Sequence, residues 1–138
     1  MEKYTIQHIT ELRSLVTRYR LSVPADFHAA SDDLLVRCYN GIGPDRWIPI
    51  LRKLSTWLLS FFEADALVHD YEFCQANKSY WHFTMANTRF CWNALLLAFQ
   101  AYPAKTAVKV GLLGVALGVL CQAFGYSGYL AGTFKEEK

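Results

Sequence analysis

The chain has few charged side chains and no concentrated positive charge. Of its 138 residues only 19% are charged, below the ~25% usual for globular domains, and the formal net charge is +2. No group of Lys or Arg residues is interleaved with stacking aromatics, so the sequence gives no indication of nucleic-acid binding. Because 53% of the residues are hydrophobic, the chain can bury a core. We expect one domain over residues 1–138.

Sustained strand-like alternation and internal repeats are both missing from the sequence. No apolar run follows Met1–Tyr4, so no signal peptide is expected. Most of the chain instead has apolar residues at helical spacing. The sequence therefore predicts an all-α protein, a compact helical bundle, located in the cytoplasm or associated with a membrane.

The cysteines are widely spaced and form no Cys-x-x-Cys pair. A zinc site would need them clustered with histidines, and they are not. Two disulfides are possible by count, in three connectivities. Because free cysteine behaves as a small hydrophobic residue and a cytoplasm is reducing, we expect free, mostly buried thiols. The cysteines are Cys38, Cys74, Cys91 and Cys121.

Helical periodicity and breaker residues together predict six helical segments. Ser31 is a suitable N-cap for the second of them, and Pro103 opens the last. Breaks are expected at Asn40–Pro44 and around Lys78, where Gly, Pro, Asn and Ser gather. The segments are 5–20, 31–38, 48–62, 64–76, 80–101 and the remainder from Pro103.

Gly111, Gly114 and Gly118 recur along one side of the last predicted helix. Glycine inside a helix costs roughly 1 kcal/mol relative to alanine, so we expect another element to pack closely against this stripe. The stripe is compatible with a buried core helix, with a membrane span over residues 107–131, and with a homo-oligomer formed through the glycine face. Glycines from Gly125 onward can mark a helix end, which favours the core interpretation.

Two short motifs suggest a metal-binding and a catalytic role. Gly41 and Gly43 form a Gly-x-Gly turn directly after Cys38-Tyr39-Asn40, and such a turn can direct backbone carbonyls toward a cation such as Ca²⁺. His69 and Asp70 place a base beside a carboxylate on a predicted helix. Each motif is common when considered alone. Their combination suggests a calcium-assisted hydrolase.

The position of Asn87 adds a geometric argument. His69 lies nine residues before Lys78, at the centre of the predicted break, and Asn87 lies nine residues after it. In an antiparallel helix pair, equal offsets bring two residues level with each other. Asn87 can then hydrogen-bond one imidazole nitrogen of His69 and leave the other to act as a base. The alternative is that Asn87 satisfies another group in the core.

With these motifs the chain resembles the phospholipase A2 superfamily, and most of all its compact phage and prophage members. The resemblance covers about residues 36–95. It implies that the carbonyls of Tyr39, Gly41 and Gly43 bind calcium together with the Asp70 carboxylate. It also implies that His69 activates a water molecule, and that the Gly41 N–H helps to stabilise the oxyanion formed at a phospholipid ester.

The sequence departs from the superfamily at two positions near the histidine. Asn87 stands where an aspartate is expected, and Phe73 stands where a tyrosine is expected. An amide can orient an imidazole but cannot offset the charge of an imidazolium. A catalytically impaired phage structural or lysis-accessory protein on the same scaffold is therefore the alternative function, and a small membrane-anchored protein is a third.

A phospholipid membrane surface is the partner that this interpretation implies. The segment 48–62 has an apolar face that can enter the lipid interface, although the same face would suit a core helix. The residues expected at the membrane are Trp47, Trp57, Phe61 and Phe62.

Overall fold

The computed structural model describes residues 5–39, 49–75 and 79–131. Within those ranges the chain is helical and contains no strand, which confirms the all-α prediction. The helices, in chain order, are α1 (Ile6–Arg18), α2 (Asp32–Cys38), α3 (Pro49–Cys74), α4 (Tyr80–Ala101), α5 (Ala104–Phe124) and α6 (Tyr126–Ala131).

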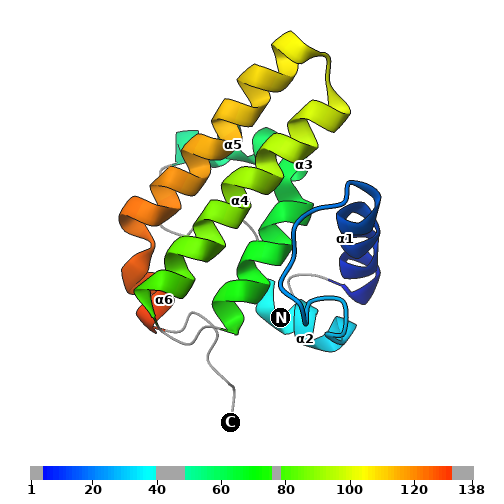
Figure 1. Cartoon of the computed structure of the whole chain (residues 1–138), viewed down its shortest axis with the longest axis vertical. Helices are drawn as coiled ribbons and strands as arrows, with labels where there is room; N and C mark the ends of the chain where they lie inside the picture. Colours follow the sequence, from blue (N-terminus) through cyan, green and yellow to red (C-terminus); the bar gives the residue numbers. More distant parts are fainter. Residues whose placement is uncertain (1–4, 40–48, 76–78, 132–138) are drawn as a thin grey trace.

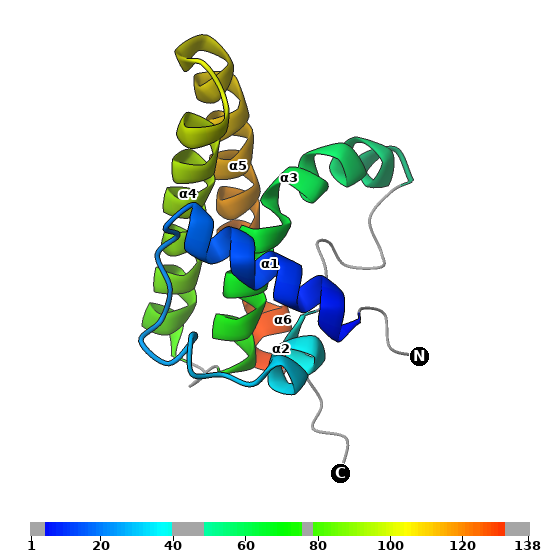
Figure 2. The ribbon, with the colours of Figure 1, turned by 90° about the vertical axis from the view of Figure 1, so that its right-hand side faces the viewer.

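Helices α4 and α5 form a long antiparallel hairpin, and α3 packs against the other side of α4 (Figure 1). Helices α1 and α2 cover α3 on the side away from α5 (Figure 2). α2 begins as expected, because the Ser31 side chain accepts a hydrogen bond from the Leu34 N–H. α6 is held on α4 partly by Tyr129, whose hydroxyl lies 2.9 Å from Nδ1 of His82.

One helix boundary differs from the prediction. Segments 48–62 and 64–76 were expected as separate helices, but α3 continues from Pro49 to Cys74 through Glu63. No glycine or proline lies between Ile50 and Cys74, so nothing in the backbone requires a break there. His69 and Asp70 consequently lie in the last two turns of a single long helix.

The main core lies where α1, α2, α3 and α4 meet. Its members are fully or almost fully buried apolar side chains, and the ring of Phe27 makes an edge contact with Tyr71 of α3. One face of α4 is buried against this core and against α5. It includes Phe83, Asn87, Phe90, Ala94 and Leu97.

The glycine stripe of α5 faces α4 of the same chain. A Cβ atom at Gly114 would lie 2.5 Å from Cβ of Ala94, and one at Gly118 would collide with Sγ of Cys91. The expected close packing is therefore present, and α4 is the partner. The three glycines are buried in this contact, and the possible homo-oligomer through Gly111, Gly114 and Gly118 stays a prediction.

Cys38 and Cys74 are joined by a disulfide, which corrects the expectation of free thiols for these two residues. Their Cα atoms lie 5.5 Å apart, well within the range that a disulfide spans. The bond connects the end of α2 to the end of α3. Cys91 and Cys121 are free and partly buried, in agreement with the expectation.

Candidate functional site

His69 and Asn87 face each other across the contact between α3 and α4. Nε2 of His69 lies 2.8 Å from Oδ1 of Asn87, and both side chains are buried. The hydrogen bond expected from their equal offsets around Lys78 is therefore present. With Oδ1 as the acceptor, Nε2 carries the proton and Nδ1 carries the lone pair of the neutral imidazole. That tautomer is the one a base acting through Nδ1 requires.

A third helix holds the Asn87 amide in place. Nδ2 of Asn87 donates to Oε1 of Gln122 on α5 at 2.8 Å. The Gln122 amide donates in turn to Oγ1 of Thr84 and to the Tyr80 hydroxyl. The histidine thus stands at the end of a hydrogen-bond chain that crosses α3, α4 and α5. The sequence motifs did not identify Gln122, although a lone amide in an apolar helix is a signal that could have found it.

Aromatic rings surround the imidazole of His69. The centroid of the Phe73 ring lies 4.2 Å from that of the imidazole, and the Phe90 ring lies 5.4 Å away in an edge-on orientation. Only 10% of the histidine side chain is exposed. Packing by these rings restricts the imidazole to one orientation and keeps most bulk water away from it.

Asp70 lies beside the nitrogen of His69 that Asn87 does not contact. Oδ1 of Asp70 is 3.8 Å from Nδ1 of His69, and 15% of the aspartate side chain is exposed. The two side chains predicted to act together are therefore neighbours in space. A partly exposed carboxylate is a suitable ligand for a hard cation such as Ca²⁺, which binds oxygen atoms.

The disulfide links the start of the predicted glycine loop covalently to the end of α3, one helical turn after Asp70. Cys74 follows Asp70 by about one helical turn, or roughly 6 Å of rise. Its partner Cys38 directly precedes Tyr39, the first residue of the predicted calcium loop. Tyr39 is buried, and its hydroxyl donates to Oε1 of Glu63 at 3.3 Å.

Gly41 and Gly43 lie outside the described residues, as does Trp47, so their predicted roles stay predictions. Within the described ranges, no group of three or more His, Cys, Asp or Glu side chains is arranged to hold a metal ion. A site formed by loop carbonyls and Asp70 has only one such side chain. The donor set that the sequence offers, backbone carbonyls with a carboxylate, still fits the chemistry that calcium prefers.

The predicted membrane-interface residues of α3 do not form one exposed apolar surface. Phe62 is completely buried, and its ring lies next to Gly114 of α5, so it belongs to the core and not to a lipid surface. Phe61 is partly buried, with its ring 5.2 Å from that of Tyr102. The side chain of Trp57 lies outside the described part of α3.

Two acidic side chains near the histidine are buried, and neither belongs to a motif visible in the sequence. Asp65 and Glu72 lie on the same side of α3 as His69. Glu72 is paired with Arg89 of α4, whereas no described residue donates a hydrogen bond to either carboxylate oxygen of Asp65. Burial raises the pKa of Asp65 well above its usual value, and the nearby Asn93 amide offsets only part of this effect.

The free thiols are poor nucleophiles. Burial raises the pKa of the Cys91 thiol above its usual value. Burial is also the main reason that the pKa of the Cys121 thiol is raised to about 11. Because the thiolate is the reactive form of cysteine, neither residue supports covalent catalysis near neutral pH.

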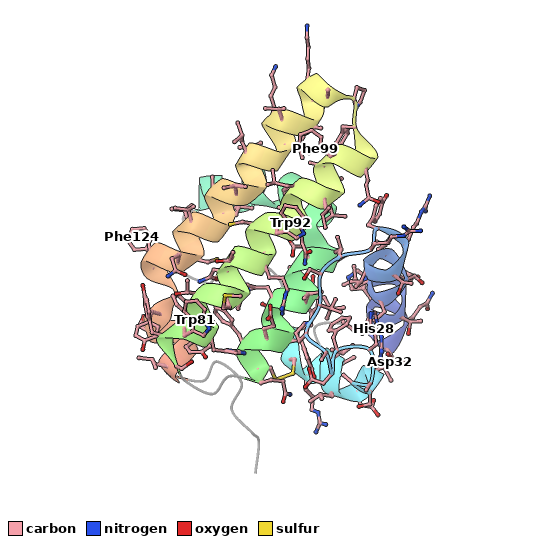
Figure 3. The ribbon with its side chains drawn as sticks, in the orientation of Figure 1. His28, Asp32, Trp81, Trp92, Phe99 and Phe124 are labelled. Atoms are coloured by element: carbon pink, nitrogen blue, oxygen red, sulfur yellow. A yellow bond between two sulfur atoms is a disulfide. The ribbon has the colours of Figure 1, made fainter. Side chains whose placement is uncertain are left out.

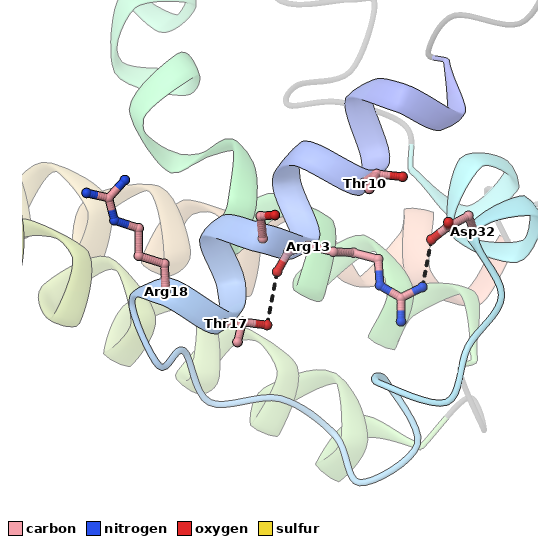
Figure 4. Close-up of a pocket in the computed structure, with 6 residues that line it drawn as sticks. Thr10, Arg13, Thr17, Arg18 and Asp32 are labelled. Carbon is pink, nitrogen blue, oxygen red and sulfur yellow. Dashed lines mark hydrogen bonds and ion pairs between the residues drawn. The ribbon is translucent and has the colours of Figure 1, made fainter.

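A shallow pocket of about 560 Å³ lies along α1 (Figure 4), away from the residues described so far. Its Arg13 guanidinium donates to the carbonyl oxygens of Ala30 and His28 and to the Asp32 carboxylate. These bonds tie α1 to the segment before α2. The lining contains no residue of α3 or α4, and the guanidinium has a structural role, so we assign no chemistry to this pocket.

Comparisons with protein-family models, with curated proteins and with solved structures give no match to this chain.

Proposed function

We propose that the chain is a calcium-dependent ester hydrolase of phospholipase A2 type, with His69 as the general base. The observation that carries the proposal is the 2.8 Å contact between Nε2 of His69 and Oδ1 of Asn87, with the Asp70 carboxylate next to the other imidazole nitrogen. A base held by an orienting residue and flanked by a carboxylate is the arrangement that hydrolysis of an ester by activated water requires.

In the proposed reaction, Nδ1 of His69 takes a proton from a water molecule. The water oxygen forms a bond to the ester carbonyl carbon, and the bond from that carbon to the alcohol oxygen then breaks. The proton on Nδ1 passes to the departing alcohol oxygen. The products are a fatty acid and a lysophospholipid, and the histidine returns to its starting state.

Asn87 positions the imidazole and fixes its tautomer in this mechanism. Its amide carries no charge, so it stabilises the imidazolium less than a carboxylate would. In serine proteases, exchanging the orienting aspartate for asparagine lowers the rate by about 10⁴ because the imidazole takes the wrong tautomer. Asn87 holds the correct tautomer through Oδ1, so only the missing charge stabilisation is expected to lower the rate here. Phe73 and Phe90 contribute by limiting the access of bulk water.

Asp70 and the carbonyls of Tyr39, Gly41 and Gly43 are the residues that would hold calcium. When bound there, the cation supplies positive charge near the oxygen atom on which negative charge develops. The Gly41 N–H is the proposed second donor to that oxygen.

The proposal is tested by fatty-acid release from phospholipid vesicles, measured with calcium and with a chelator. Wild-type protein with its disulfide intact should release fatty acid only with calcium, and Asp70→Ala should reduce release to the level seen with chelator. Asp32→Ala is the matched control and should retain activity. It removes a carboxylate of α2 that pairs with Arg13 of α1 and takes no part in the proposed site. Equal release with and without calcium would contradict the calcium assignment.

A second candidate is a phage structural or lysis-accessory protein that keeps the scaffold without effective catalysis. The uncharged Asn87 beside His69 is the observation that favours it. This candidate predicts no fatty-acid release under any condition, together with retained binding to membranes.

A further inference from the structure

Helix α5 is apolar on nearly all sides, yet most of its surface is not covered by protein. The most apolar 18-residue window of α5 has a mean hydropathy of 1.9, and only 28% of that window is buried inside the fold. A helix that is hydrophobic all round is normally enclosed by a core or by lipid. The exposed apolar side chains of α5, here called the α5 face, are Val108, Leu112, Leu113, Val119, Leu120 and Phe124.

These positions form one continuous surface. At 3.6 residues per turn they cover an arc of roughly 160°, opposite the glycine stripe that packs on α4. Leu112 is 60% exposed and Phe124 is 78% exposed. Phe124 points away from the bundle at the outer edge of α5 (Figure 3). Trp92 and Phe99 of α4 are also exposed, so the apolar surface extends across the hairpin.

The charged side chains that α4, α5 and α6 themselves carry are all positive. The sequence contains no Asp or Glu from Phe73 to Lys135, a stretch that includes α4, α5 and α6. Arg89 is paired with Glu72 of α3, whereas Lys105 and Lys109 are exposed in the first turns of α5, on the same arc as the α5 face. An apolar surface with lysines at one end complements a lipid surface that carries negative charge.

From these observations we propose that the α5 face is a membrane-docking surface for bilayers containing anionic phospholipid. The apolar side chains enter the headgroup and acyl boundary, and Lys105 and Lys109 extend toward lipid phosphates. This surface differs from the one expected on α3, and binding through it requires no hydrolysis.

The structure favours docking on the surface over crossing the bilayer. The inner side of α5 is fixed against α4, and α4 carries Arg89 in an ion pair with Glu72. A crossing orientation would place this ion pair at membrane depth, where charged groups are costly. A second copy docked through its own α5 face is a poorer occupant, because α4, α5 and α6 carry no acidic residue that can pair with Lys105 and Lys109.

The test is flotation of the full chain with vesicles of phosphatidylcholine, with or without phosphatidylglycerol, in the presence of chelator so that no calcium-dependent hydrolysis occurs. Wild type should bind the anionic vesicles. Leu112→Gln and Val119→Gln should each weaken binding by about tenfold, because each removes one leucine- or valine-sized apolar contact from the lipid. Ile6→Gln, an exposed apolar residue on α1, is the matched control and should bind like wild type.

Charge is tested in the same assay. Lys105→Gln with Lys109→Gln should reduce the preference for anionic vesicles by about tenfold or more, at roughly 1 kcal/mol per basic residue, whereas Arg37→Gln on α2 should not. The proposal is overturned if wild type does not float, or if the α5 variants bind as well as Ile6→Gln. A dimer interface would also overturn it. In that case sedimentation shows a wild-type dimer that Leu112→Gln converts to a monomer, and neither protein binds vesicles.

This test is independent of catalysis. His69→Gln should bind vesicles like wild type, so its binding reports on the α5 face alone. Vesicle binding without fatty-acid release would contradict the proposed hydrolase and leave the docking surface supported. If Leu112→Gln and Val119→Gln leave both fatty-acid release and vesicle binding unchanged, the docking surface is contradicted and the proposed hydrolase is not.

Discussion

Asn87 on α4 holds His69 on α3 through a 2.8 Å contact between Oδ1 and Nε2, and it is itself held by Gln122 on α5. An orienting residue with two fixed neighbours has little freedom to move. The imidazole therefore keeps the same edge toward Asp70, which is the geometric condition for a base that acts repeatedly on bound water.

Asn87→Asp should increase hydrolysis, because a carboxylate at this position adds charge stabilisation of the imidazolium. Because Oδ1 of Asn87 already fixes the tautomer, the gain comes from charge alone and should stay below the factor of about 10⁴ that the wrong tautomer costs in serine proteases. The Gln122 amide can rotate to present Nε2 to the new carboxylate. Steady-state fatty-acid release measures the effect. Gln100→Glu, which gives a carboxylate to an exposed amide of the same helix, is the control and should not raise kcat. A decrease in the folded Asn87→Asp variant would contradict the proposed role.

Cys38→Ser should destabilise the fold by about 3–4 kcal/mol, because the disulfide closes a loop with a sequence separation of 36. It should also lower hydrolysis, since the chain beside Tyr39 is no longer fixed to the end of α3. Denaturant unfolding with and without reductant measures the stability change. Reductant should have no further effect on Cys38→Ser, and wild type should lose the same stability when reduced. An unchanged unfolding midpoint in reductant would show that the bond does not form.

Gly114→Ala should destabilise the protein by about 1–3 kcal/mol. The new Cβ would lie 2.5 Å from Cβ of Ala94 and 2.9 Å from Cζ of Phe62, so α5 has to move away from α4. Gly111→Ala is the matched control. There the nearest atom is the flexible Cδ2 of Leu95 at 2.9 Å, and the gain in helix propensity of about 1 kcal/mol offsets the contact. Thermal unfolding compares the two, and equal midpoints would argue against close packing at Gly114.

Asp65 should make the fold less stable as the pH rises. Its pKa is raised in the folded state, so the folded chain binds the proton more tightly than the unfolded chain does. The stability that this proton contributes is complete below the unfolded pKa of about 3.9 and is lost as the pH rises through the folded pKa. Each unit by which the pKa is raised corresponds to about 1.4 kcal/mol.

Asp65→Asn removes this titration and should flatten the dependence of the unfolding free energy on pH, with a gain in stability at neutral pH. Urea unfolding across a pH series measures it. Asp32→Asn, on the partly exposed carboxylate that pairs with Arg13, is the control. The same slope in wild type and Asp65→Asn would contradict the assignment of the buried proton.

Much of the helical arrangement follows from local signals in the sequence. The bounds of α4 were predicted correctly because Ser79 caps its start and Pro103 follows its end. The glycine stripe correctly indicated a close helix contact, although only the fold identifies α4 as the neighbour. α3 was divided wrongly into 48–62 and 64–76, although no breaker residue separates the two segments.

The site was predictable to the extent that one helix pair positions it. His69 and Asn87 meet because both lie at equal distances from a turn, and that relationship is visible in the sequence. The disulfide was not predictable in the same way, because Cys38 and Cys74 meet only after α2 packs on α3. Nor was the role of Gln122, which depends on the rotation of α5 about its own axis.

The role of His69 as the base is tested most directly by fatty-acid release from phospholipid vesicles with calcium. His69→Gln is compared with wild type and with His28→Gln, which replaces an exposed histidine before α2. We expect His69→Gln to lose release while remaining folded with its disulfide intact, and His28→Gln to retain it. Equal release by His69→Gln and wild type, or none by wild type, would contradict the assignment of His69 as the base.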